Sequence, residues 1–95
     1  MPGSRVWFNA HAHRQMRERD LSVDDILEVA RSGEVIEDYP ADYPYPTQLV
    51  LGVVRGRTVH VAIALQHELD AIIILTAYEP TLDRWETGFR IRRPR

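Results

Sequence analysis

Residues 58–78 read TVHVAIALQHELDAIIILTAY, and this stretch decides the fold. Its two ends are runs of β-branched and aliphatic residues around the polar segment 66–70, which is the pattern of a β-hairpin. Because almost every residue in the two arms is apolar, we expect both faces of the hairpin to be largely covered. Polar residues interrupt the arms at His60, Thr76 and Tyr78. A turn centred in the polar segment predicts that His60 lies opposite Thr76, with Tyr78 further along the same face.

Burying polar side chains costs free energy unless they find hydrogen-bond partners. The cluster of His60, Thr76 and Tyr78 is therefore either a satisfied network in the core or the floor of a site. The other face of the hairpin is uniformly apolar, and we expect the helices to cover it. The side chains of that face are Val59, Val61, Ile63, Leu65, Ile73 and Leu75.

Two helices are expected before the sheet. Asn9 is a good N-cap for a helix over residues 10–19. Ser22 and Asp25 form the Ser-x-x-acid pattern that begins a second helix. Gly33 is well placed to end this second helix.

Two further strands are expected over residues 34–39 and 47–54, with a bulge possible at Gly52. The order α-α-β-β-β-β predicts an α+β fold in which two helices pack on a four-stranded, mainly antiparallel sheet. With 95 residues and 44% apolar content, the chain fits one domain over residues 1–95. We expect its core over about residues 8–86 and a basic, partly frayed tail over residues 87–95.

The composition narrows the class of protein. The chain has no run of about 18 apolar residues, no basic and apolar leader at its N-terminus, and no cysteine. We therefore expect a cytoplasmic protein without a membrane span, a disulfide or a thiolate metal site. The net charge of −2 argues against a generic nucleic-acid binder, although residues 5–19 and 90–95 are basic and every basic residue is Arg.

Several short patterns occur in a recognisable order along the chain. They are His11-Ala12, Glu18-Arg19, Gly33-Glu34-Val35-Ile36-Glu37-Asp38-Tyr39, Asp42-Tyr43-Pro44-Tyr45-Pro46, His60-Val61-Ala62, Thr76-Ala77-Tyr78-Glu79-Pro80 and Trp85. Together they resemble the family called domain of unknown function 4258, a distant relative of the RelE-like toxins and related ribonucleases. The resemblance implies a helix pair on an antiparallel sheet that carries the active site. It also implies metal-independent cleavage of RNA by a toxin that a cognate antitoxin neutralises. The family usually has glycine after its Glu-Arg pair, where Asp20 stands in this chain.

Metal-free RNA cleavage needs a base for the 2′-hydroxyl, an acid for the leaving 5′-oxygen and a cation for the phosphorane charge. His11 and His60 are the candidate acid–base pair, and Arg19 is the candidate cation. Tyr78 is an alternative proton-transfer group. The candidates for substrate binding are Arg14, Thr76 and Tyr43.

These residues also have structural interpretations. His60 can be a hydrogen-bonded core histidine, and Arg19 can form an ion pair with Glu18 or Glu37. We expect no cofactor and no metal site. The alternative function is a non-catalytic interaction module that binds a protein partner through the Tyr/Pro loop 39–46 and the sheet edge. The sequence makes no prediction about the oligomeric state.

Overall fold

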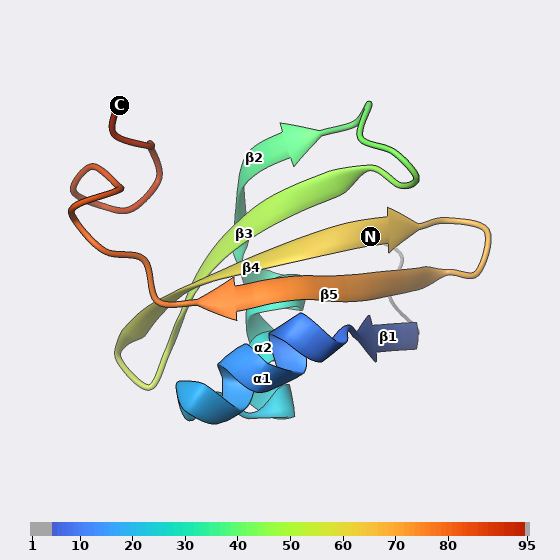
Figure 1. Cartoon of the computed structure of the whole chain (residues 1–95), viewed down its shortest axis with the longest axis horizontal. Helices are drawn as coiled ribbons and strands as arrows, with labels where there is room; N and C mark the ends of the chain where they lie inside the picture. The colour runs from blue at the N-terminus through green and yellow to red at the C-terminus, as the bar shows by residue number, and fades with distance from the viewer. Residues whose placement is uncertain (1–4, 95) are drawn as a thin grey trace.

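The computed structural model describes residues 5–94 and has two helices on one side of a five-stranded mixed sheet (Figure 1). Along the chain the elements are β1 (Arg5–Phe8), α1 (Ala10–Glu18), α2 (Val23–Ser32), β2 (Glu34–Tyr39), β3 (Thr47–Val54), β4 (Arg57–Gln66) and β5 (Ala71–Tyr78). The strand order in the sheet is β1-β5-β4-β3-β2. The prediction of an α+β fold with a helix pair is confirmed.

The prediction of four strands is wrong because residues 5–8 form a fifth. Strand β1 pairs in parallel with β5, so that Val6 lies beside Ile72 and Phe8 beside Ile74. The four residues of β1 are too few to show an alternating pattern in the sequence. Their pairing satisfies backbone groups along the first half of β5, which would otherwise be an open sheet edge. β2 to β5 are antiparallel to one another, as expected.

Both helices begin at the residues that the sequence indicates. The side chain of Asn9 accepts a hydrogen bond from the backbone N–H of Ala12 at 2.8 Å. Ser22 and Asp25 form a complete capping box, in which each side chain accepts from the backbone N–H of the other. These contacts satisfy N–H groups that have no partner inside the helix.

Helix α1 ends in a Schellman motif. The N–H of Leu21 donates to the carbonyl of Met16, and Leu21 and Met16 are both buried. Asp20 takes the left-handed backbone conformation of this motif, with φ at 53°. Glycine adopts this conformation without strain, which gives a physical reason for the glycine that the resemblance leads us to expect at this position.

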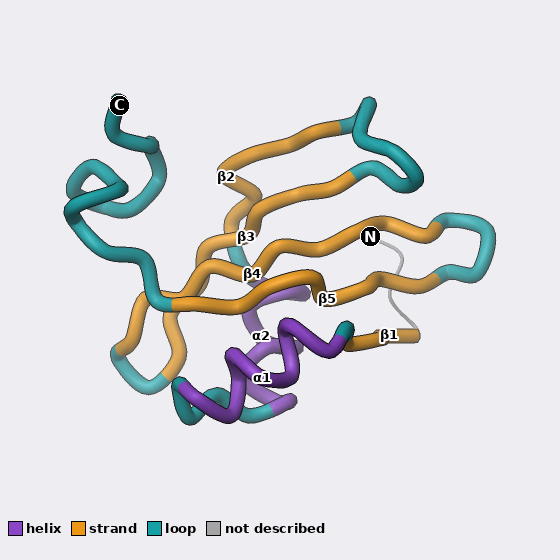
Figure 2. Tube along the Cα trace, viewed as in Figure 1, coloured by secondary structure: helices purple, strands orange, loops and turns teal. Residues whose placement is uncertain are grey.

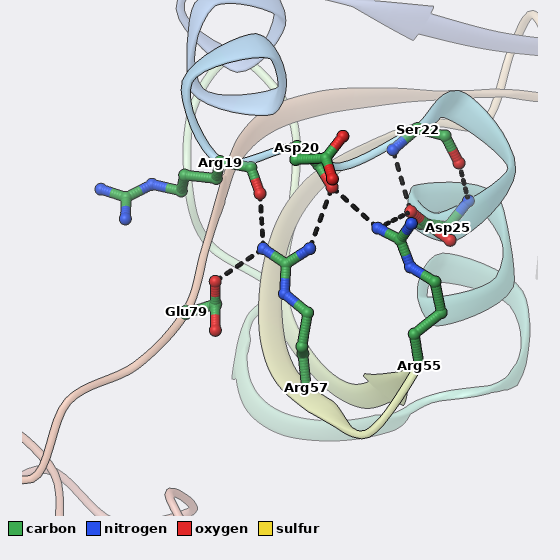
Figure 3. Close-up of polar contacts among 7 residues, drawn as sticks. All are labelled: Arg19, Asp20, Ser22, Asp25, Arg55, Arg57 and Glu79. Carbon is green, nitrogen blue, oxygen red and sulfur yellow. Dashed lines mark hydrogen bonds and ion pairs between the residues drawn. The ribbon is translucent and has the colours of Figure 1, made fainter.

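Two arginines, one in the turn between β3 and β4 and one at the start of β4, hold the end of α1 (Figure 3). Arg57 donates to the carbonyls of Arg19 and Asp20, and to the carboxylate of Glu79 at 2.6 Å. Arg55 donates to the carbonyl of Asp20 at 2.8 Å and to Asp25 at 3.0 Å. The hairpin turn therefore ties both helices and the end of β5 together.

The register of the central hairpin differs from the prediction. His60 lies opposite Tyr78, and Thr76 lies opposite Ala62. A β-bulge at Leu75 adds one residue to β5, and the pairing near the turn is also shifted by one residue from the expected register. The two shifts add up to two residues, so His60, Thr76 and Tyr78 still belong to one face.

The shift near the turn decides which side chains in the first half of β5 meet the helices. Ile72 and Ile74 face the core, whereas the sequence pattern predicted Ile73 and Leu75. The prediction for β4 is confirmed, because its apolar row packs with the helices. The core consists of Ala12, Met16, Leu21, Ile26, Val29, Ala30, Val50, Val54, Val59, Val61, Ile63, Leu65, Ile72, Ile74 and Ala77.

Two glycines allow α2 to pack closely on β3. A Cβ on Gly33 would lie 2.6 Å from the carbonyl oxygens of Val29 and Leu51. A Cβ on Gly52 would lie 2.8 Å from a methyl group of Val29. Gly33 ends α2 as predicted, but Gly52 is not a bulge, because the pairing of β3 with β4 is continuous there.

The segment after β5 folds back toward β2 (Figures 1 and 2). Arg90 binds Glu34 and Arg92 binds Glu37, which anchors the segment to β2. Within the segment, Trp85 forms a β-bridge with Arg92. These contacts place the segment against β2, and the expectation of a partly frayed tail stays a prediction.

Replacing Asp20 with glycine should stabilise the protein. A left-handed backbone conformation costs a non-glycine residue about 1–2 kcal/mol, whereas glycine adopts it without strain. Glycine also loses more chain entropy on folding, which offsets part of this gain. We expect Asp20→Gly to raise the free energy of unfolding by about 0.5–1 kcal/mol in urea titrations. Asp20→Ala is the control and should not stabilise. A glycine variant less stable than the wild type would mean that the Asp20 side chain contributes more than its backbone strain costs.

Candidate functional site

A polar groove of about 360 Å³ lies between α1, the end of β5 and the C-terminal segment. We call it the arginine groove, and it is lined by Gln15, Arg19, Tyr78, Glu79, Pro80, Thr81, Arg84, Trp85 and Arg92. Three of these side chains are cationic and one is a carboxylate. The groove is therefore positively charged, although the chain as a whole carries a net charge of −2.

The arginines of the groove differ in how they are held. Neither Arg19 nor Arg84 makes a hydrogen bond or ion pair through its guanidinium with any residue between 5 and 94. Figure 3 shows the Arg19 side chain pointing away from Arg57 and Glu79. Arg92 is held by a bidentate contact with Glu37, at 2.7 and 3.0 Å, and its guanidinium lies 4.7 Å from the centre of the Trp85 ring. The groove thus has two guanidiniums available for an anion and a third that is rigidly placed.

Gln15 connects α1 to the part of β5 that β1 does not cover. Its side-chain oxygen accepts from the hydroxyl of Thr76 at 2.6 Å and from the backbone N–H of Ala77 at 2.8 Å. The pairing with β1 ends at Ile74, so these backbone groups would otherwise lie on an open edge. The contact places α1, with Arg19 as its C-cap residue, beside Tyr78.

The hydroxyl of Tyr78 hydrogen bonds to His60, which has no exposed surface. Nε2 of His60 lies 2.8 Å from the carbonyl oxygen of Phe89, and Nδ1 lies 3.1 Å from the Tyr78 hydroxyl. A carbonyl can only accept, so Nε2 carries the proton. In the neutral ring Nδ1 is then the acceptor, and Tyr78 donates to it.

Burial sets the protonation states of this pair. Burial lowers the pKa of His60 below its ordinary value of 6.5, and the hydrogen bond with Phe89 and the nearby Glu37 offset this only in part. Burial also raises the pKa of the Tyr78 hydroxyl above its ordinary value. At neutral pH we therefore expect a neutral imidazole that accepts from a protonated phenol.

Comparison with models of protein families matches residues 8–79 to the family described as a domain of unknown function (DUF4258). The chain belongs to this family. Neither the curated proteins nor the solved structures gave a match. The DUF4258 match confirms the family that the ordered motifs resemble, and it includes Gln15, Arg19, His60 and Tyr78. It ends at Glu79, before the C-terminal segment.

The structure brings together part of the residue set predicted for this DUF4258 protein. Arg19 and Tyr78 line the arginine groove, His60 lies behind Tyr78, and Thr76 is linked to the groove through Gln15. Arg19 forms no ion pair with Glu18, and the partner of Glu37 is Arg92.

Three predicted residues lie elsewhere. His11 and Arg14 are exposed on α1, and Tyr43 is 95% exposed in the loop between β2 and β3. The side chain of His60 faces the C-terminal segment, on the side of the sheet opposite the helices. The structure therefore does not bring His11 and His60 together.

Sequence reasoning missed Gln15, Arg84 and Arg92 as residues of the site. Gln15 is recognisable only as a polar residue at the border of the buried face of α1. Arg84 and Arg92 belong to a segment without helix or regular strand, so no periodic pattern predicts where their side chains point. The abundance of Arg at the end of the chain is the single signal that the sequence offers.

No cluster of three or more His, Asp or Glu side chains that could hold a metal ion occurs within residues 5–94. In the same part of the chain, no helix is long and apolar enough to cross a membrane.

His60 should make the stability of the protein depend on pH below about 6.5. The unfolded chain takes up a proton at the ordinary pKa of 6.5, whereas the folded protein resists protonation until a lower pH. The free energy of unfolding should therefore fall as the pH drops through 6.5, by about 1.4 kcal/mol for each tenfold difference in proton affinity. His60→Gln keeps one donor and one acceptor but does not titrate. In urea titrations between pH 8 and 5, its stability deficit relative to the wild type should narrow as the pH falls.

The matched control for this measurement is His67→Gln, because His67 is exposed in the turn between β4 and β5. A wild type and a His60→Gln variant with parallel pH profiles would contradict the assignment of a buried neutral imidazole.

Proposed function

We propose that this protein is a metal-independent endoribonuclease that binds single-stranded RNA in the arginine groove. The observation that carries the proposal is the position of two unpaired guanidiniums, Arg19 and Arg84, beside the hydrogen-bonded pair Tyr78 and His60. Guanidinium groups suit phosphodiester oxygens in charge and geometry. Tyr78 adds a hydroxyl that is already connected to a proton acceptor.

The arrangement of the helices and the sheet is compatible with the same proposal. A helix pair on one face of a mainly antiparallel sheet agrees with a distant relationship to the RelE-like ribonucleases. On this proposal the protein is a prokaryotic toxin that acts on RNA in the cytoplasm, and a cognate antitoxin protein neutralises it.

The proposed reaction is attack of the 2′-hydroxyl oxygen on the adjacent phosphorus atom. The bond from phosphorus to the 2′-oxygen forms and the bond to the 5′-oxygen breaks, which leaves a 2′,3′-cyclic phosphate and a 5′-hydroxyl. The oxygen of Tyr78 accepts the proton of the 2′-hydroxyl while Tyr78 passes its own proton to Nδ1 of His60. A water molecule protonates the leaving 5′-oxygen, and the relay then returns its proton to the solvent.

Two features of the His60 environment offset part of the cost of this transient charge. The imidazolium would keep its bond to the carbonyl of Phe89, and the nearby carboxylate of Glu37 would favour it electrostatically. The guanidiniums of Arg19 and Arg84 would stabilise the negative charge of the phosphorane, which is where preorganised donors contribute most to the rate. In this proposal the relay of Tyr78 and His60 replaces the acid–base pair of His11 and His60 that the sequence suggested.

A second candidate function is the interaction module expected as the alternative. The observation that favours it is the exposed edge strand β2, where Val35 and Tyr39 are 47% and 44% exposed. An edge strand with exposed apolar side chains can pair with a strand of a partner protein. The two candidates differ in whether the purified protein cleaves RNA.

The test of the proposed function is cleavage of a fluorescent single-stranded RNA by the purified protein in the presence of EDTA. We expect the wild type to produce 2′,3′-cyclic phosphate ends. Arg19→Ala combined with Arg84→Ala should lower the rate by about 100-fold or more, because it removes two charge-stabilising groups. Tyr78→Phe should lower it by about 100-fold through loss of the proton relay.

Arg17→Ala is the matched control, because Arg17 lies on the same helix and does not line the arginine groove. Its rate should stay within about twofold of the wild type. Equal losses in Arg17→Ala and in the groove variants would contradict the assignment of the groove. If the folded wild type leaves single-stranded RNA intact with and without EDTA, the interaction module becomes the better reading.

A further inference from the structure

A second concave region lies on the sheet face opposite the helices. We call it the sheet-face groove, and its volume is about 330 Å³. Leu49, Ala62 and Leu75 contribute apolar surface to it. Ala62, on the central strand β4, leaves room in the groove because its side chain is only a methyl group. The bulge in β5 lets the neighbouring residues Leu75 and Thr76 both line the same groove.

The sheet-face groove combines apolar, aromatic and acidic groups. Tyr39 lines it, is 44% exposed, and donates its hydroxyl proton to Glu37 at 2.8 Å. Asp42 also lines it and accepts a hydrogen bond from Thr47 through one carboxylate oxygen. The other oxygen of Asp42 makes no hydrogen bond with any residue between 5 and 94, so it can accept one from a ligand.

The two grooves adjoin each other. Tyr78 and Arg92 line both the arginine groove and the sheet-face groove. A ligand whose anionic part lies against Arg19 and Arg84 therefore has an apolar, partly aromatic surface next to it. A nucleotide has this combination, with a phosphate joined to a flat ring that stacks on aromatic side chains and presents N–H donors at its edge.

We propose that the sheet-face groove binds an unpaired base of the RNA whose phosphodiester lies in the arginine groove. The inference rests on the proposed function for the presence of RNA. The base stacks on Tyr39 over the apolar surface of Leu49, Ala62 and Leu75, and one of its N–H groups donates to Asp42. A base in a duplex is stacked and paired, so the groove selects single-stranded RNA.

The test measures binding without cleavage. The probes are a fluorescent single-stranded pentamer of 2′-deoxynucleotides and a pentamer of the same length with tetrahydrofuran residues in place of the nucleosides. Both lack the 2′-hydroxyl, so neither can be cleaved by the proposed reaction. We expect the wild type to bind the base-bearing pentamer about tenfold more tightly than the abasic one in anisotropy titrations at one salt concentration.

Two variants test where the base lies. Ala62→Leu fills the groove and should reduce the affinity for the base-bearing pentamer to that for the abasic one, which should itself be unchanged. Tyr39→Ala, on the exposed edge strand, should remove most of the same difference, and it remains informative if Ala62→Leu fails to fold. Arg19→Ala combined with Arg84→Ala should weaken both pentamers to the same extent and reduce their salt dependence.

The outcomes separate this inference from the proposed function. Equal wild-type affinity for the two pentamers would overturn the base site and leave phosphate binding in place. A preference for bases that survives in both Tyr39→Ala and Ala62→Leu would also overturn it, as would equally tight binding of a DNA duplex. Failure to bind either pentamer would remove the nucleic-acid function and this inference together.

Discussion

The hydrogen bond from His60 to the carbonyl of Phe89 links the sheet to the C-terminal segment, and the arginine groove depends on that link. A fully buried imidazole needs partners for both of its nitrogens, because an unpaired buried polar group costs about 1–3 kcal/mol. Tyr78 satisfies Nδ1 from within the sheet, but no side chain on the sheet satisfies Nε2 within residues 5–94. The chain beyond β5 supplies the missing acceptor. In doing so it brings Trp85 against the His60 ring at a centre-to-centre distance of 4.4 Å.

The same link holds a segment without regular secondary structure against the sheet. Trp85 is buried, with 2% of its surface exposed. Its ring forms an edge-to-face contact with His60 and a cation–π contact with Arg92. Arg92 in turn binds Glu37 on β2. Exposed ion pairs contribute little to stability by themselves. We therefore expect the buried aromatic contacts and the hydrogen bond to Phe89 to contribute most to the packing of the C-terminal segment on the sheet. Arg84 and Arg92 reach the arginine groove because of this packing.

Much of the fold could be predicted because its signals are local. The side chains of Asn9 and Ser22 begin helices through contacts three residues away, and the central hairpin follows from two apolar runs around a polar turn. The failures come from interactions that have no local signal. Pairing of β1 with β5 joins segments more than 60 residues apart, as Phe8 and Ile74 show. The bulge at Leu75 lies inside a uniform aliphatic run, in which any residue could be the extra one.

The sequence could predict those residues of the candidate site that lie on the sheet. The polar residues His60 and Tyr78 stand out among aliphatic neighbours, and the structure places them in contact. Pairing His60 with His11 depended on residue type alone, and the sheet separates the two side chains. Residue type also could not show that Arg84 would line the same groove as Arg19, because tertiary contacts and not a local pattern set the path of the segment that carries Arg84.

Net charge misleads about binding in this protein because ion pairs neutralise some of its charged groups and not others. Within residues 5–94, Arg55, Arg57, Arg90, Arg92 and Arg93 each form an ion pair with a carboxylate. The first two contacts hold the hairpin turn to α2 and to the end of β5, the next two hold the C-terminal segment to β2, and the last lies within that segment. Within the same residues Arg19 and Arg84 have no such partner, and both line the arginine groove, so their guanidiniums contribute positive potential there even though the chain is slightly acidic. The field in a cleft depends on the nearest charges, and an anion approaching this groove meets two arginines that form no ion pair with a carboxylate within residues 5–94.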